Sequence, residues 1–401
     1  SDSGVTSTSA SDKRNWNIPG DGKFDTTTPP STVELACGRI DFANMVNVPT
    51  GMTEVQLLRQ YLVREHRFRR NLPPYGNVAR RGIVDGNFGT SYADVGWRNG
   101  FGMFGNKAGQ MDALDYFTTL ANTPMLFAYG CGSGGWTSAQ GVGDSLVDFD
   151  RKDVKAVFHL LFGSYFGDWD KTDSFLCAPL AGTPHSLGLC SQWGGLLLYH
   201  MPLGEPIGAS VRFTQNYVQG AGGWTPFSFS AHGSAINVNL MGDPTLRLHS
   251  VTPPSRVTAH SSVGGVSLAW EVSPDPAIGG YHVYRAPSAG GPFTRITGTA
   301  ADGANPAGSP LEKTTLSYTD TDPGLEAGTS YTYLVKAVKI ETTPSGTYAN
   351  QSVGEAVTVV EAHGPGDRVA DRHDHPEPVE GARRHPDHLR QRLPPAGARR
   401  G

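Results

Sequence analysis

The chain has 401 residues, more than one hydrophobic core usually organises, so we expect two domains with tails. Hydrophobic residues make up 38% and charged residues 17%, and the 51 Gly and 29 Pro favour a loop-rich protein that can still bury a sizeable core. The net charge of -4 gives no field that would attract nucleic acid or an anionic membrane, and no apolar run approaches the roughly 18 residues of a membrane span.

Residues 1–30 are rich in Ser, Thr, Gly, Pro and Asp without an apolar period, which is typical of an extended lead-in. Because the chain opens on Ser1 and not on Met, we expect a processed or truncated start. The four cysteines are too few for a disulfide scaffold, but Cys177 and Cys190 could close one loop. Such a link would fit an oxidising compartment, and we expect a protein that is secreted or held at a cell surface.

The ordered part begins with residues 33–42 (VELACGRIDF), an apolar run of strand length. A helix is predicted over residues 53–67, where Thr53 and Gln56 form a capping-box pattern. The apolar residues at helical spacing in this segment are Val55, Leu58, Tyr61 and Leu62.

Short apolar runs then alternate with a helical pattern. Residues 82–85 (GIVD), 125–129 (MLFAY) and 156–162 (AVFHLLF) are typical of buried strands, and residues 108–120 have the pattern of a helix. This alternation predicts an α/β fold with a mostly parallel sheet and flanking helices.

Two glycine-rich segments directly follow predicted strands. They are residues 130–135 (GCGSGG) and residues 163–170 (GSYFGDWD). Because function gathers at the carboxyl ends of parallel strands, these segments are the candidate functional site.

From Pro253-Pro254 onward the pattern changes to period-two runs without convincing helices, which predicts an all-β antiparallel sandwich. The runs are residues 266–272, 280–284, 317–319, 331–339 and 356–360. Residues 362–401 consist largely of Arg, Pro, His and Gly and cannot bury enough apolar area to offset the entropy of ordering, so we expect a disordered tail. The tail composition also looks like an out-of-frame reading of a GC-rich gene.

Four motifs in the first 250 residues together resemble the gingipain-type, caspase-fold cysteine peptidases. In chain order they are residues 21–25 (DGKFD), residues 38–40 (GRI), residues 129–132 (YGCG) and residues 241–248 (MGDPTLRL). The resemblance implies a peptidase-like domain over residues 31–250 that is a fragment, with the first strands of a full family domain upstream of Ser1. We interpret residues 241–248 as architectural and Arg39 as one member of a structural ion pair.

Residues 253–361 resemble a fibronectin type III domain. The positions that carry this resemblance are Pro253, Pro254, Trp270, residues 281–285 (YHVYR), Leu325, Tyr331 and Tyr333. It implies that Trp270 and Leu325 fill the core and that Tyr331 forms a tyrosine corner, with its hydroxyl bound to the backbone.

The gingipain-type resemblance implies a catalytic dyad that this chain has lost. The family places Gly-His-Gly after one strand and a nucleophilic Cys after the next, where this chain has Gly130-Cys131-Gly132 and Ser164. Cys131 and Ser164 therefore occupy the catalytic positions without reproducing the chemistry. The turns that carry Gly130, Gly132 and Gly163 could still present backbone N–H groups to an anion or a peptide carbonyl.

Cys131 itself has three competing interpretations. It could be a small apolar residue in a tight turn, a redox or metal-binding thiol, or a relocated nucleophile. A relocated nucleophile needs an imidazole brought near it by the fold, and the candidates are His159, His185, His200 and His232.

An acidic cluster follows the second turn. Asp168, Asp170 and Asp173 could hold Ca²⁺ through oxygen ligands, so calcium is a possible cofactor; a solvated turn is the competing interpretation. Asp168 and Trp169 could also line a binding pocket, although Trp169 could equally serve packing.

Three functions remain open at this point. The first is a secreted peptidase-like protein without its dyad that serves as a scaffold or binding module for a protein or peptide. The second is an active cysteine endopeptidase that uses Cys131. The third is a carbohydrate-associated adhesin whose sandwich binds a cell-surface glycan.

Overall fold

The computed structural model describes residues 32–49, 51–88, 90–150, 153–165, 171–192, 197–218, 238–298 and 308–362. These residues belong to one compact unit with two apolar cores, one between Phe42 and Leu248 and the other between Val251 and Ala337. No helix among them has the length and apolarity needed to cross a membrane. The predicted lead-in and almost all of the predicted tail lie outside the described residues, and the predicted domain limits stay a prediction.

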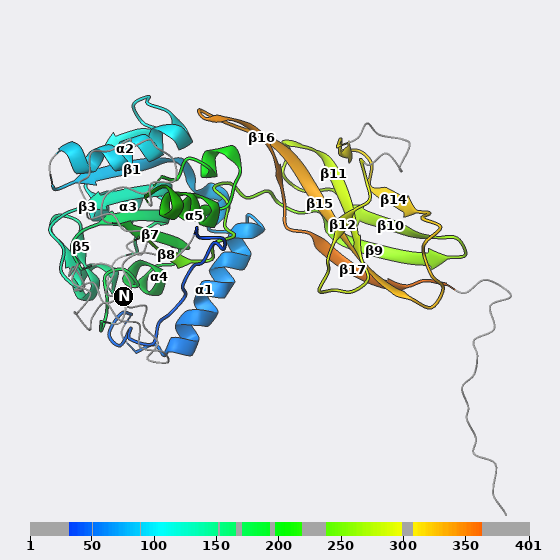
Figure 1. The fold of residues 1–401 in the computed structure, drawn as a ribbon, viewed down its shortest axis with the longest axis horizontal. Helices are drawn as coiled ribbons and strands as arrows, with labels where there is room; N and C mark the ends of the chain where they lie inside the picture. The colour runs from blue at the N-terminus through cyan, green and yellow to red at the C-terminus, as the bar shows by residue number, and fades with distance from the viewer. Residues whose placement is uncertain are drawn as a thin grey trace, which may run out of the picture. The chain divides into compact units, whose positions relative to one another are not determined.

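A six-stranded, mostly parallel sheet organises the first core (Figure 1). Its strands, in spatial order, are β2 (Met111–Ala113), β1 (Ala79–Gly86), β3 (Met125–Cys131), β6 (Ala156–Phe162), β7 (Gly188–Gln192) and β8 (Val238–Gly242). All neighbours pair in parallel except β7 and β8, which are antiparallel. Every residue of β3 and β6 is buried, as expected for central strands covered on both faces. The α/β fold class predicted from the sequence is confirmed.

Helices lie on both faces of this sheet. They are α1 (Glu54–Arg69), α2 (Thr90–Phe104), α3 (Tyr116–Asn122), α4 (Ala178–Gly182) and α5 (Ile207–Val218), with short helical turns at Tyr75–Asn77, Ser145–Phe149 and Met201–Leu203 and a small hairpin of β4 (Ser138–Ala139) and β5 (Gly143–Asp144). The α2 helix packs on one face, where Gly96 lies against the ring of Tyr129. The α3 helix packs on the other, where Tyr116 contacts His159.

The α1 helix begins at the predicted capping box, but of the four apolar residues noted at helical spacing only Tyr61 is buried. The Thr53 amide donates to Gln56 Oε1 at 2.8 Å, and the Gln56 amide donates to Thr53 Oγ1 at 3.4 Å. The buried positions are Leu57, Tyr61, Arg64 and Phe68, whereas Val55, Leu58 and Leu62 are exposed. The prediction missed this face because Arg64, a charged residue, occupies its middle and donates to the carbonyls of Leu180 and Thr183.

Two other predicted elements differ from the structure, and one helix was not predicted. Residues 33–42 form no strand but a single bridge, between Arg39 and Met241, since the Asp41 carboxylate accepts the Ala43 amide and turns the chain. The predicted helix over residues 108–120 begins only after Asp115, and its first part is β2. The α2 helix was missed because its glycines weaken helix propensity; at Gly96 a Cβ atom would lie only 2.5 Å from the Tyr129 ring.

Two motifs that are about 200 residues apart in the sequence meet at the edge of the sheet. The Arg39 amide donates to the Leu240 carbonyl at 2.9 Å, and the Gly242 amide donates to the Arg39 carbonyl at 2.8 Å. A side chain at Gly38 would collide with the Gly242 carbonyl. Residues 38–40 and 241–248 are thus one architectural unit, and Arg39 forms the predicted structural ion pair, with Asp41.

Tyr61 fastens this unit to the rest of the sheet. Its fully buried hydroxyl donates to the Leu187 carbonyl at 2.8 Å and accepts the Asp243 amide at 2.8 Å. The Asp243 carboxylate in turn accepts the amide and hydroxyl of Thr245 and a guanidinium N–H of Arg69. One side chain from α1 therefore satisfies backbone groups on both sides of the β7–β8 pair.

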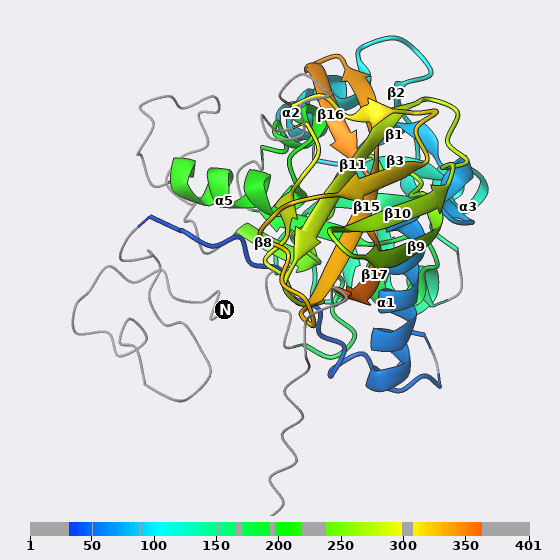
Figure 2. The same ribbon diagram turned by 90° about the vertical axis from the view of Figure 1, so that its right-hand side faces the viewer.

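The second core lies between two antiparallel sheets (Figure 2). One sheet contains β14 (Ser317–Asp320), β10 (Gly265–Glu271) and β9 (Ser255–Ser262), and the other contains β12 (Thr294–Arg295), β11 (Ile278–Ala286), β15 (Ser330–Thr343) and β16 (Gly346–Gln351), with β13 (Leu311–Glu312) on β11 and β17 (Glu355–Val360) on β15. Trp270 packs in the core, the partly buried Leu325 packs against it, and the Tyr331 hydroxyl accepts the Glu326 amide at 3.1 Å. The predicted sandwich and tyrosine corner are confirmed.

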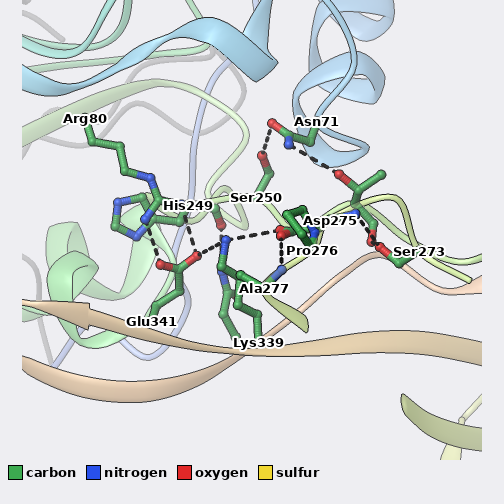
Figure 3. Close-up of polar contacts among 12 residues, drawn as sticks. Asn71, Arg80, His249, Ser250, Ser273, Asp275, Pro276, Ala277, Lys339 and Glu341 are labelled. Carbon is green, nitrogen blue, oxygen red and sulfur yellow. Dashed lines mark hydrogen bonds and ion pairs between the residues drawn. The ribbon is translucent and has the colours of Figure 1, made fainter. Parts of the chain in front are cut away.

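Ion pairs connect the α/β part to the sandwich (Figure 3). Arg80 of β1 donates to both carboxylate oxygens of Glu341 on β15, at 2.7 and 3.1 Å, and Lys339 links Glu341 to Asp275. Burial acts to raise the pKa of Glu341, but the hydrogen bond from Arg80 and the nearby positive charges hold it below its usual value. Glu341 is therefore a buried carboxylate that keeps its charge because it is paired.

The Tyr61 contacts predict that removing its hydroxyl destabilises the fold. In Tyr61→Phe, the Leu187 carbonyl and the Asp243 amide each lose a buried partner, and we expect the free energy of unfolding to fall by about 1–3 kcal/mol. Tyr165→Phe, which removes an exposed hydroxyl, should change it by less than about 0.5 kcal/mol. Urea unfolding measures both, and equal losses in the two variants would contradict the assigned role.

Candidate functional site

The carboxyl ends of β3 and β6 lie side by side and carry the two glycine-rich turns. Cys131 pairs with Phe162 in the parallel register, and the Gly132 amide continues the ladder by donating to the Phe162 carbonyl at 3.1 Å. A side chain at Gly134 would collide with the backbone of Ser164, so the turns touch directly. The structure therefore brings together residues 130–135 and residues 163–165, the described part of the second segment that the sequence singled out.

The Cys131 thiol is buried beneath a helix. Strand alternation places it on the same face as Tyr129, and the side chain is 0% exposed. The Tyr129 hydroxyl donates to the Tyr92 carbonyl of α2 at 2.6 Å. Burial raises the pKa of Tyr129, and the neighbouring Cys131 adds to this. The thiol is thus part of the packing between β3 and α2.

His159 lies on the opposite face of the sheet. His159 of β6 pairs with Ala128 of β3. Along β3, Ala128 points to the opposite face from Tyr129 and Cys131, so the His159 ring points toward α3. One ring nitrogen contacts the Tyr116 hydroxyl, and Nε2 lies 2.6 Å from Ser186 Oγ. Burial lowers the pKa of His159 to about 3, which keeps the ring neutral. The sheet itself separates this imidazole from Cys131.

The remaining candidate bases are not joined to the turns either. His185 precedes β7, at its amino end, and its Nδ1 lies 3.8 Å from an oxygen of Asp153. His200 follows β7 and packs on the ring of Phe213, with 4.7 Å between ring centroids. His232 lies outside the described residues. Within the described ranges, no hydrogen bond links an imidazole to Cys131 or Ser164.

Among the glycines predicted to line a binding site, Gly130 and Gly132 differ from Gly163 in their surroundings. Gly130 is buried, and a Cβ atom there would lie 2.8 Å from Val142. The Gly132 amide is used by Phe162, and a side chain there would collide with the Gln140 carbonyl. Both glycines therefore serve packing, whereas Gly163 and Ser164 are half-buried at the edge.

Most of the predicted calcium cluster cannot be placed. Asp168, Trp169 and Asp170 lie outside the described residues. Asp173 is buried, and its carboxylate accepts the amides of Val46 and Asn47 at 2.8 and 2.9 Å and the Asn47 side chain at 2.7 Å. No group of three or more metal-ligating side chains occurs among the described residues. The Asp173 carboxylate holds a loop in place.

The structure also corrects the expectation of a disulfide bond. All four cysteines are unpaired, so the predicted link between Cys177 and Cys190 is wrong. Cys177 lies at the start of α4 and Cys190 within β7, and both are buried. Their thiols contribute to the apolar core instead.

An aromatic pair at this edge was missed from the sequence. Trp136 and Tyr165 are 53% and 56% exposed, and their rings meet edge to face at 5.9 Å. Lys171 Nζ lies 5.4 Å from the centre of the Trp136 ring. Tyr165 adopts a left-handed backbone conformation, with φ of 67°. The signal was present, because each aromatic directly adjoins a glycine-rich turn.

The burial of His159 predicts how the free energy of unfolding depends on pH. Its native pKa lies below the value of the unfolded chain, so between about pH 6.5 and pH 3 the unfolded state binds a proton that the native state does not. The free energy of unfolding should therefore fall on acidification, by about 1.4 kcal/mol per pH unit from this residue.

The variant His159→Gln isolates this contribution from the other titrating groups. Chemical unfolding between about pH 6 and pH 4 should give the variant a shallower slope than the parent chain. Parallel curves would show that His159 is not neutral in the native state.

The chain resembles known proteins only distantly. No protein-family model and no curated protein matches it. Among solved structures, the Arg-specific cysteine proteinase gingipain R aligns over 76% of this chain and 73% of its own, with 11% identity and a TM-score of 0.42. A structure described as a protease covers the same shares at 11% identity and a TM-score of 0.39. An Fn3-like protein from Clostridium thermocellum aligns over 28% of this chain and 95% of its own, with 25% identity and a TM-score of 0.20.

Proposed function

We propose that this chain is a peptidase-like protein without a working dyad, secreted or held at a cell surface, that binds a protein or peptide segment at the carboxyl edge of its sheet. The observation that carries the proposal is the separation of Cys131 from His159 by the sheet. The sandwich serves as a spacer or second contact surface.

Cysteine peptidase chemistry has two requirements that Cys131 and His159, within the part of the chain that the structure describes, do not meet together. The thiolate must reach the scissile carbonyl, and an imidazole must lie within hydrogen-bond distance to move protons. Cys131 is 0% exposed, and His159 makes its hydrogen bonds on the other face. Ser164, at the second position, would need a base of its own, because a free hydroxyl is a weak nucleophile.

The exposed surface at the same edge suits binding. Trp136 and Tyr165 offer two aromatic rings fixed against each other, and such rings supply large contact area at low entropic cost. Lys171 adds a positive charge beside them. We infer that the preferred segment presents an apolar or aromatic side chain to the rings and a carboxylate to Lys171.

The glycan-binding alternative gains no support from the sandwich. Trp270, Tyr281 and Tyr333 are each at least 95% buried and fill its core. Stacking on sugars needs exposed rings, and the exposed aromatic pair belongs to the α/β part.

Selection from a displayed random-peptide library tests the binding surface. Enriched peptides should bind the double variant Trp136→Ala/Tyr165→Ala at least about 10-fold more weakly than the parent, because both rings are lost. Leu35→Ala, at another exposed apolar residue, is the matched control and should bind like the parent. Equal affinity for the parent and the double variant would contradict the assigned surface.

The same peptides test the absence of catalysis. We expect them to stay intact during incubation with the purified chain, and Cys131→Ala to bind them with unchanged affinity, because the thiol does not reach the edge. Mass spectrometry follows the peptides. Cleavage that disappears in Cys131→Ala would establish an active endopeptidase instead.

A further inference from the structure

A polar pocket, away from the carboxyl edge, lies where the α/β part meets the sandwich. It has a volume of about 370 Å³. Arg247 and His249 line it from the segment that follows β8, and Lys336 and Gln351 line it from β15 and β16. Arg69 also lines the cavity but is paired with Glu65 and Asp243, so Arg247 and Lys336 are the positively charged groups considered below.

Arg247 and Lys336 have no counter-charge in the part of the chain that the structure describes. Among the described residues, neither Arg247 nor Lys336 forms an ion pair with a carboxylate. Burial lowers the pKa of Lys336, and the charge of Arg247 lowers it further, so the two groups repel each other.

The carboxylates near the pocket form ion pairs with other cations. Glu355 pairs with Arg70, and Asp243 pairs with Arg69. Glu341 pairs with Arg80 and Lys339 (Figure 3). An anion from solution would therefore meet two uncompensated charges here.

The pocket also holds its donors in place. Lys336 Nζ lies 4.8 Å from the centre of the Tyr284 ring, a cation–π contact that restrains the ammonium group. The Tyr284 hydroxyl donates to Gln351 Oε1 at 2.8 Å, which leaves the NH₂ group of the same amide to donate elsewhere. A guanidinium, an ammonium and an amide together form a donor set suited to an oxyanion.

We propose that this pocket binds a doubly charged tetrahedral oxyanion, the chemistry shared by phosphate and sulfate groups. Two positive charges match a dianion better than a single carboxylate, and several oxygens can each accept one of the donors. Because Arg247 and Lys336 come from different parts of the chain, the bound anion strengthens their association.

Calorimetry and thermal unfolding of the full chain with inorganic phosphate or sulfate test the site, with sodium chloride holding ionic strength constant. We expect saturable binding of both anions and a higher Tm than in chloride alone, because the ligand stabilises the native state. Arg247→Ala and Lys336→Ala should each weaken binding by about 10-fold or more. Lys336→Arg, which keeps the charge, should retain it.

Lys313→Ala is the matched control, since it removes one exposed positive charge from the sandwich outside the pocket. It should bind phosphate like the parent chain. Phosphate acting no differently from chloride, or both alanine variants binding like the parent, would overturn the proposal. Acetate binding as tightly as phosphate would overturn the assignment to a doubly charged oxyanion.

Discussion

The parallel register between β3 and β6 is the constraint on which the carboxyl edge depends. Side chains in strands alternate between faces, so the pairing of Ala128 with His159 sends His159 and Cys131 to opposite sides of the sheet. A shift of one residue would reverse the face of every side chain in β6 and expose the core. The same register that builds the core thus keeps Cys131 and His159 apart.

The glycines of the edge are explained by close approach of backbones. A side chain at Gly132 would collide with Gln140, and one at Gly134 would collide with Ser164, so the two turns meet because position 134 is glycine. This geometry is compatible with an active peptidase and equally with a binding module. The difference lies in the residues between the glycines: a buried thiol in one turn, and an exposed aromatic pair beside both.

Strands that have a local apolar pattern could be predicted from the sequence. Features that depend on polar contacts between distant segments could not. The central strands were found because residues 125–129 and 156–162 are continuous apolar runs. The buried face of α1 was missed because Arg64 finds carbonyl partners more than 100 residues away. The orientation of Cys131 could not be predicted either, since one residue at a strand end carries no periodicity of its own.

The most direct test of the account is the alkylation rate of each cysteine in the native chain, measured by mass spectrometry with iodoacetamide. Cys37 is exposed and should react rapidly, whereas buried Cys131 should react only on the timescale of unfolding. Cys177 and Cys190, which are also buried, serve as internal references. Alkylation of Cys131 faster than that of Cys37 would contradict the account, because only an accessible and activated thiol reacts in that way.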